Sequence, residues 1–439
     1  MTSDAPRLVA RTVALSDTPD LFAEAGDLGL LWADERGGLA GNGVAARLDI
    51  PGGLSNPESV KRVTAALQSI ETVDEVGLPG CGPVAIGALP FDPTSSGHLT
   101  IPRRVVGRAG RLGWLTTIEE ATTKEATTKE ATTEPSPAAA ERVALDGSGS
   151  CPGPGSGSAS SPPDQFTLTS TMSHRDWKET VAEAVTTLRQ GDLVKVVLAR
   201  RIEITANRAF VVSDVLERLA ALYPSCMIFS VGGFIGASPE LLLSRIGDRV
   251  ESHPLAGTVA RSGDVHGDET LVAKLLSSPK ARYEHQVVVD VLCAALEPLC
   301  GELTVPDGPS VVGLRNVSHL GTHITGRLRP AGPGGHPSAL ELAARIHPTP
   351  AVGGTPTDAA IRYLQKVEGF DRGCYAGPVG WVDRRGDGAW AVGIRSADVE
   401  GATARLYAGN GIVEGSDPAE ELAETQLKLQ ALLAALVRP

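Results

Sequence analysis

Residues 193–204 read LVKVVLARRIEI, a run rich in β-forming residues. Apart from Lys195, the side chains from Leu193 to Ala199 are apolar on both faces, which is typical of a strand buried on both sides. Lys195 therefore has two interpretations. Either the protein uses it, in which case burial would lower its pKa toward that of a working base, or it lies near the strand end with its ammonium in water. The pattern alone leaves both open.

The segments around this strand carry signals of both helix and strand. Helices are predicted over residues 176–190, 212–222, 268–299 (with a break near Pro279), 357–368 and 418–437. Strands are predicted over residues 227–236 and 241–246 and in a β meander over 375–412. Because these elements alternate without a regular βαβ rhythm, we predict an α+β fold with largely antiparallel sheet.

Composition excludes several classes of protein. The chain has 439 residues, with 40 Lys+Arg against 52 Asp+Glu and a formal charge of −12. This acidic balance argues against nucleic acid or an anionic membrane as the main partner. Apolar runs are far shorter than the roughly 20 residues that span a bilayer, and no secretory signal is visible. The six cysteines form no CxxC pair, as in a reducing compartment, so we expect a cytoplasmic protein.

Residues 120–134 form a repeat, EATTKEATTKEATTE, and residues 147–163 are rich in Gly, Ser and Pro. The repeat contains no apolar side chain larger than Ala, so it cannot bury enough surface to offset its ordering entropy. We predict that residues 117–164 are a disordered insertion without chemistry. It would separate an N-terminal part, 1–116, from a catalytic region, 165–439.

Glu240 lies in FIGASPELLLS, directly before three leucines. Burial there would raise its pKa and keep it protonated near neutrality, as a general acid requires. The triplet Ser238-Pro239-Glu240 reads equally well as the start of a helix, where a carboxylate is ordinary.

Three further glutamates fall on predicted helices. Glu284 shares its helix face with Val288 and Val291, where a carboxylate is costly unless it is paired or bound to a metal. Glu421 and Glu424 share one side of the last helix, away from its leucines, so their pattern alone predicts exposure to solvent. Carboxylates from separate helices would suit Mg²⁺.

Arg395 follows the apolar run AVGI, where it could grip a carboxylate bidentately or lie on the surface. Gly257-Thr258 and Asn410-Gly411 each offer a glycine at which backbone N–H groups can approach an anion closely. His319 and His323 are separated by a stretch containing glycine, so the helical spacing of a zinc site is not expected.

Many short stretches resemble the chorismate-utilising enzymes, and among these most closely the isochorismate synthases. They occur in the family's order over about residues 165–437, and they are KVVLAR (195–200), GASPELLL (236–243), PLAGT (254–258), KARYEH (280–285), HLGT (319–322), HPTPAVGG (347–354), FDRGCYAGPVGW (370–381), IR (394–395), GNGIVEGSDP (409–418) and EELAETQLKL (420–429).

The resemblance implies one large α+β domain in which two similar halves enclose a buried, Mg²⁺-dependent site. By motif, Lys195 is the base that activates water for attack at ring C2, and Glu240 is the acid that protonates the departing C4 hydroxyl. Glu284 and Glu424 hold Mg²⁺, which binds the ring carboxylate, with Glu421 nearby.

The remaining implied site residues bind the substrate. Tyr375 and Arg395, together with Gly411, would hold the enolpyruvyl carboxylate. The metal-bound end and the rest of the pocket would be lined by Gly257, Thr258, His319 and Ala351.

Single positions separate the family members. Relatives that use ammonia usually have glutamine at the position of Lys195, aminodeoxychorismate synthases often have a lysine at that of Ala256, and salicylate synthases tend to have threonine at that of Ala351. The resemblance therefore implies an isomerase that converts chorismate to isochorismate, for quinone (menaquinone) or siderophore synthesis. The alternatives are a salicylate synthase and, more remotely, a catalytically silent chorismate-binding protein. Nothing in the sequence demands more than a monomer, so we expect a monomer.

Overall fold

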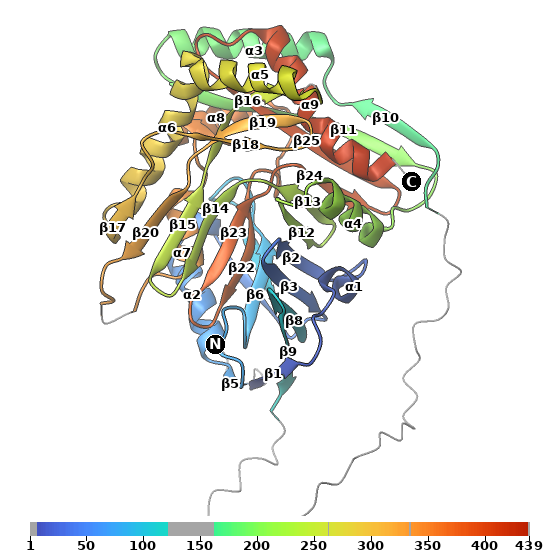
Figure 1. Ribbon diagram of the computed structural model, residues 1–439, viewed down its shortest axis with the longest axis vertical. Helices are drawn as coiled ribbons and strands as arrows, with labels where there is room; N and C mark the ends of the chain where they lie inside the picture. The colour runs from blue at the N-terminus through green and yellow to red at the C-terminus, as the bar shows by residue number, and fades with distance from the viewer. Residues whose placement is uncertain (1–6, 122–161, 262, 333–334, 438–439) are drawn as a thin grey trace, which may run out of the picture.

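The computed structural model describes residues 7–121, 162–261, 263–332 and 335–437. Their strands form two large sheets and a small one (Figure 1). The first large sheet has thirteen strands within the described residues. In sheet order these are β10 (Phe166–Ser170), β11 (Lys195–Ala206), β25 (Thr403–Ile412), β24 (Ser396–Glu400), β13 (Phe234–Ser238), β12 (Met227–Val231), β2 (Leu30–Asp34), β3 (Gly37–Asn42), β8 (Arg104–Ala109), β9 (Leu112–Glu120), β1 (Leu8–Leu15) and β5 (Glu71–Asp74), with β21 (Gly354–Thr355) beside β11.

The second large sheet contains, in order, β17 (Cys300–Thr304), β20 (Ile324–Leu328), β15 (Arg249–His253), β14 (Leu241–Ile246), β23 (Gly388–Val392), β22 (Pro378–Asp383), β6 (Val84–Ala88), β7 (Gly97–Ile101) and β4 (Ala46–Ile50). The small sheet contains β16 (Leu255–Ala260), β19 (Val317–Gly321) and β18 (Ser310–Gly313). Strand pairs in the described residues are antiparallel, except that β1 and β5 run parallel.

Helices cover the outer faces of these sheets (Figure 1). They are α1 (Leu21–Ala25), α2 (Pro57–Gln68), α3 (His174–Arg189), α4 (Val212–Leu222), α5 (Val265–Ser277), α6 (Pro279–Leu296), α7 (Ala339–Ile346), α8 (Thr357–Val367) and α9 (Pro418–Val437), with a 3₁₀ turn at Gly53–Ser55. The predicted α+β class with large antiparallel sheets flanked by helices is confirmed. Among the described residues, no helix combines the length and apolar character needed to cross a membrane.

Several predicted elements agree closely with the structure, and two are divided. The stretch at 227–236 forms a hairpin of two strands, β12 and β13. The helices at 212–222 and 418–437 and the strand at 241–246 have the predicted bounds, and the 268–299 helix is broken at Ser278-Pro279 as expected. The 375–412 segment is not one meander, because β22 and β23 join the second sheet whereas β24 and β25 join the first.

The predicted insertion begins too early. Residues 117–120 complete β9, which pairs with β1 as far as Glu120 opposite Leu8. At the other end, the backbone N–H of Asp164 donates to Asn207 Oδ1 at 3.2 Å. The rest of the predicted insertion, residues 122–161, lies outside the described residues.

The chain passes between the two large sheets at several points, and two of these lie side by side. One is the link from β13 to β14, which contains Glu240, and the other is the link from β23 to β24, which contains Arg395. The backbone N–H of Val392 donates to Glu240 O at 3.0 Å, and that of Ala237 donates to Arg395 O at 3.2 Å. These bonds hold the two links together between the sheets.

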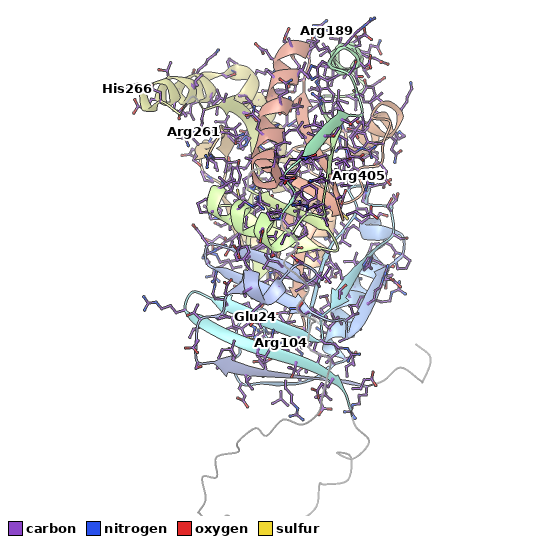
Figure 2. The ribbon with its side chains drawn as sticks, turned by 90° about the vertical axis from the view of Figure 1, so that its right-hand side faces the viewer. Glu24, Arg104, Arg189, Arg261, His266 and Arg405 are labelled. Atoms are coloured by element: carbon purple, nitrogen blue, oxygen red, sulfur yellow. The ribbon has the colours of Figure 1, made fainter. Side chains whose placement is uncertain are left out.

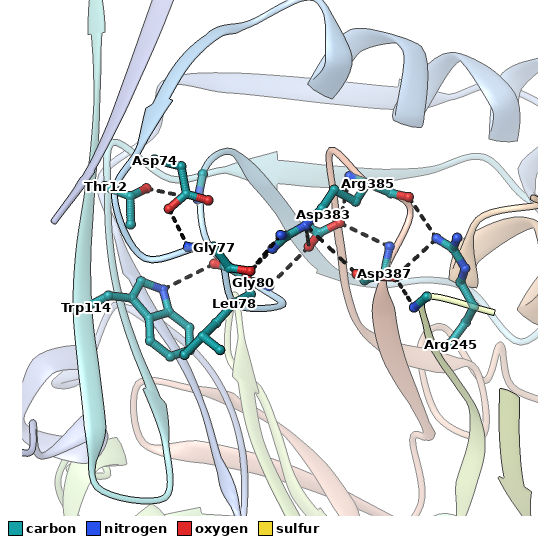
Figure 3. Close-up of polar contacts among 12 residues, drawn as sticks. Thr12, Asp74, Gly77, Leu78, Gly80, Trp114, Arg245, Asp383, Arg385 and Asp387 are labelled. Atoms are coloured by element: carbon teal, nitrogen blue, oxygen red, sulfur yellow. Dashed lines mark hydrogen bonds and ion pairs between the residues drawn. The ribbon is translucent and has the colours of Figure 1, made fainter. Parts of the chain in front are cut away.

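Contacts on the periphery fasten the N-terminal elements. On α1, Glu24 forms an ion pair with Arg104 of β8, and both side chains lie on the lower part of the molecule (Figure 2). Farther inside, the turn between β22 and β23 binds the loop that follows β5 (Figure 3). Asp383 is fully buried and accepts from the backbone N–H groups of Gly80, Arg385 and Asp387 at 3.1, 2.8 and 3.0 Å.

We predict that Asp383→Ala lowers the free energy of unfolding by on the order of 3 kcal/mol, because three buried N–H groups lose their acceptor. Asp383→Asn retains Oδ1, which accepts two of the three bonds, and should cost clearly less. Urea unfolding of both variants tests this. Equal, small losses for Ala and Asn would contradict the assigned role.

Candidate active site

A cavity between the sheets collects most of the residues predicted for the site. Those that line it are Glu240, Gly257, Thr258, Glu284, His319, Ala351, Tyr375, Arg395, Gly411 and Glu424. Lys195 does not line the cavity but forms an ion pair with Glu284, which does. Glu421 also lies outside the lining, where it contacts Lys280 and Asn410. The cavity volume is about 60 Å³. Small-molecule sites typically measure about 300–1,000 Å³, so lining side chains must move to admit a ligand.

Lys195 is the first residue of β11, and its side chain is 1% exposed. Its Nζ lies 3.1 Å from Glu284 Oε1 on α6. The alternative in which the ammonium reaches water is therefore wrong. The β11 strand has β25 as its neighbour, and a Cβ on Gly411 of that strand would lie 2.0 Å from Glu284 Oε1 and 2.8 Å from Lys195 Cε. Glycine at position 411 thus makes room for the ion pair.

Glu240 lies in the link between β13 and β14 and is 3% exposed. It does not start a helix, because the leucines that follow it form β14. Burial raises the pKa of Glu240 to about 7, although a backbone bond from Leu255 and the charges of Lys195 and Arg395 act in the opposite direction. A large share of this carboxyl group is protonated at neutral pH, so it can serve as an acid.

Arg395 adopts a left-handed backbone conformation with φ of 52°. This conformation is energetically unfavourable for a non-glycine residue, and the link between β23 and β24 imposes it. Arg395 Nη2 lies 3.0 Å from His319 Nε2. Since a guanidinium only donates, Nε2 accepts and the proton of the imidazole is on Nδ1, near Gly257 O and Thr258 Oγ1. Burial and Arg395 lower the pKa of His319 well below its usual value, so the ring is neutral.

Arg395 thus lines the cavity and is not a surface arginine. Tyr375 lies close to it, and burial raises the pKa of the Tyr375 hydroxyl to about 12, so this group remains a hydrogen-bond donor. Its ring stacks on Tyr407 with centroids 5.0 Å apart. Together with Arg395, Tyr375 gives this end of the cavity donors suited to an anion.

Each of the three candidate metal ligands contacts a lysine. Glu284 pairs with Lys195, and Glu424 Oε1 lies 2.7 Å from Lys428 Nζ. Glu421 Oε1 accepts from Lys280 Nζ at 3.0 Å, and its Oε2 accepts from Asn410 Nδ2 at 3.0 Å.

The exposure predicted for Glu421 from its pattern is wrong, because this residue is 3% exposed. The polar side of α9 packs against β25, where Asn410 binds the carboxylate. Burial and the charge of Glu424 raise the pKa of Glu421. The side chain of Glu424 is 27% exposed and faces the cavity.

These contacts decide how well a cation fits. Among the described residues, no three His, Cys, Asp or Glu side chains form a preassembled metal site. Glu284 and Glu424 both face the cavity, and they present the oxygen atoms that Mg²⁺ prefers, with water completing its shell. The oxygens of Glu421 are engaged elsewhere. The donor set therefore fits Mg²⁺ with two carboxylates, once their lysine partners move.

Lys280 and Lys428 are the functional candidates that the sequence analysis missed. Both stand in stretches that carry the family resemblance, KARYEH and EELAETQLKL. The i, i+4 spacing of Glu424 and Lys428 on one helix was a usable signal for their ion pair.

A larger groove, of about 730 Å³, lies on the surface between β10, α4 and α9. Its lining is mainly apolar and includes Phe166, Leu222 and Leu433. It contains none of the predicted site residues, so the smaller cavity between the sheets is the candidate active site.

The comparisons with known proteins agree with this geometry. The family model described as chorismate binding enzyme matches residues 17–437, so the chain belongs to this family. The isochorismate synthase DhbC of Bacillus subtilis is 42% identical over 274 residues, which cover 60% of this chain and 67% of that protein. The isochorismate synthase EntC of Escherichia coli is 35% identical over 356 residues, 80% of each chain. The crystal structure of DhbC from Bacillus anthracis, 33% identical, has a TM-score of 0.76 and covers 95% of this chain and 98% of that one.

The raised pKa of Glu240 predicts a pH-dependent stability. Between the usual value of 4.5 and about 7, the unfolded chain releases this proton while the folded protein keeps it, so stability falls as pH rises through this window. Glutamine does not ionise, so Glu240→Gln removes the loss of stability that accompanies ionisation of the buried carboxyl group. We expect the free energy of unfolding of the variant, relative to wild type, to rise by roughly 3 kcal/mol between pH 5 and pH 8.

Denaturant unfolding at the two pH values measures this difference. Glu58→Gln, at an exposed position of α2, is the control. A difference between Glu240→Gln and wild type that does not change with pH would contradict the buried acid.

Proposed function

We propose that this protein is an isochorismate synthase, which converts chorismate to isochorismate. The observation that carries the proposal is the arrangement of three side chains around one cavity. Glu240 is buried and lines the cavity, Lys195 is buried directly behind its lining, and Arg395 also lines it. An acid, a candidate base and an anion-binding arginine are what exchange of a ring hydroxyl requires. The isochorismate synthases among the relatives support the same reaction.

Local charge must bind the substrate, because chorismate carries two carboxylates and the protein has a net charge of −12. Arg395 and the Tyr375 hydroxyl would hold the enolpyruvyl carboxylate, near the backbone of Gly411. Glu284 and Glu424 would hold Mg²⁺ at the other end of the cavity, close to Gly257 and Thr258. Bound Mg²⁺ would supply the positive charge that neutralises the ring carboxylate.

Two proton transfers remain for the side chains. Glu240, which is partly protonated at neutral pH, would give its proton to the C4 hydroxyl as this group leaves. Lys195 would accept a proton from the water that attacks C2. For this, Lys195 must leave its ion pair with Glu284 as an uncharged amine. His319, neutral and bonded to Arg395, would keep the guanidinium oriented.

A salicylate synthase is the second candidate, since it would share these steps and then eliminate pyruvate. Ala351 lines the cavity where such enzymes tend to have threonine, and this favours release of isochorismate. Purified protein incubated with chorismate and Mg²⁺ separates the two. Isochorismate as the main product supports the proposal, whereas equal amounts of salicylate and pyruvate would replace it with the alternative.

In the same assay, Lys195→Ala should lower kcat by about 10²–10⁴-fold, the usual contribution of one general base. Lys178→Ala, at an exposed position of α3, is the matched control and should retain the wild-type rate. If Lys195→Ala turns over like this control, Lys195 is not the base.

Calorimetric titration with Mg²⁺ tests the two ligands without relying on turnover. Glu284→Gln should weaken Mg²⁺ binding by at least about 10-fold, because it removes a carboxylate that faces the cavity. Its effect on the unfolding midpoint should be small in comparison. Glu420→Gln, on the exposed side of α9, is the control. Unchanged Mg²⁺ affinity of Glu284→Gln would remove this residue from the ligand set.

A further inference from the structure

A buried ion pair behind the cavity has no part in the chemistry described so far. Glu368 follows the end of α8, and Arg372 lies four residues later, in the stretch that leads to Tyr375. Both side chains are 4% exposed. Arg372 Nε donates to Glu368 Oε2 at 2.8 Å, and Nη2 contacts Glu368 Oε1.

This pair also binds the backbone of the strand that carries Lys195. Arg372 Nη2 donates to Val197 O, and Glu368 Oε1 accepts from Ala199 N at 2.8 Å. A third bond runs from Arg372 Nη1 to Val352 O at 2.8 Å, next to Ala351. Both Val197 and Val352 line the cavity.

The bonds to Val197 and Ala199 satisfy backbone groups of β11 that no neighbouring strand in the described part of the chain reaches. One edge of β11 pairs with β25 along residues 196–205. The other edge pairs with β21 at residues 195–196 and with β10 at 202–206, and among the described residues no strand pairs with the stretch between them. The side chains of Arg372 and Glu368 bind this open stretch in place of a strand.

We propose that Arg372 and Glu368 form a clamp that positions Lys195 against the Ala351–Val352 wall of the cavity. Arg372 is a positioning residue, since it acts through β11 and through the loop at 351–352. Its backbone carbonyl also accepts from Tyr375 N at 2.9 Å, which ties the clamp to a third cavity residue. The inference rests on the proposed function, because it assigns Lys195 a catalytic task.

The position of the clamp predicts which kinetic constant changes. Its side chains are bonded to the strand of the base, whereas Arg395 and the carboxylates Glu284 and Glu424 come from other elements. The bond from Tyr375 uses the backbone carbonyl of Arg372, which a change of the Arg372 side chain retains. Loss of the clamp should therefore lower kcat, with little effect on the KM for chorismate. A displacement of a reacting group by about 1 Å can cost on the order of 100-fold in rate.

The structure also offers a route for chemical rescue. A second cavity, of about 440 Å³, is lined by Arg372, Glu368 and Phe91. The guanidinium of Arg372 lies 4.2 Å from the centroid of the Phe91 ring. In Arg372→Ala, methylguanidinium added to the solution could enter this cavity and occupy the place of the lost group.

The test is kinetics of Arg372→Ala with chorismate and Mg²⁺, with kcat expressed per folded protein. We expect kcat to fall by on the order of 100-fold, KM to stay within about twofold, and methylguanidinium to restore a measurable part of kcat. Arg372→Lys keeps the charge but cannot make all these bonds, so it should be intermediate.

Arg245→Ala is the matched control, because Arg245 is a buried arginine paired with Asp387 at 3.3 Å, in the network of Figure 3. It should lose stability but keep kcat per folded protein, and methylguanidinium should not change its rate. If Arg372→Ala behaves like this control, the clamp is only structural and the inference fails, while isochorismate formation by wild type still supports the proposed function.

Discussion

The exclusion of water from the space that β11 and β25, the small sheet, α6 and α9 enclose beside the links between the two large sheets is the constraint on which the site depends. A carboxyl group there loses its hydration, and its charged form becomes costly unless nearby groups compensate. Glu240 receives one backbone bond and feels the positive charges of Lys195, Arg395 and Lys428, which do not offset its burial, so its pKa is about 7. The fold itself produces this situation, since Glu240 lies where the chain leaves one sheet for the other.

The same constraint explains how the other charges are arranged. Near the cavity, Glu284, Glu421 and Glu424 each contact a lysine, whereas Arg395 contacts a neutral histidine and forms no ion pair with a carboxylate of the residues that the structure describes. Lysine ammonium groups on flexible stems are exchangeable counter-ions, whereas the guanidinium of Arg395 is fixed by its left-handed backbone and by His319. One end of the site is thus rigid and ready for an anion, and the other end can rearrange around a cation.

Sequence reasoning predicted the fold class and most of the cavity lining, but the residues differ in how well their own sequence context could place them. Apolar residues on both sides of Lys195 and after Glu240 were compatible with burial, but the pattern left a lysine that reaches water and a glutamate at a helix start open. The resemblance to the family decided between these interpretations. The three helix glutamates were harder to place. The pattern of α9 describes only that helix, and it cannot reveal that Asn410 on another strand takes up the carboxylate of Glu421. Lys280 was missed for the same reason, since its partner Glu421 lies on another helix. Lys428 pairs with Glu424 on the same helix, and the i, i+4 spacing of these two residues could have revealed it. The split of residues 375–412 between two sheets depends on the turn at Arg395, whose positive φ no residue preference predicts.

The central claim is that Glu240 remains protonated up to neutral pH, and its titration can be followed directly. Protein labelled with ¹³C in the carboxyl groups of glutamate, compared with the Glu240→Gln variant, identifies the resonance of this residue by NMR. The account predicts that this resonance titrates with a pKa of about 7. Titration of the Glu240 resonance near the usual glutamate value of 4.5 would contradict it.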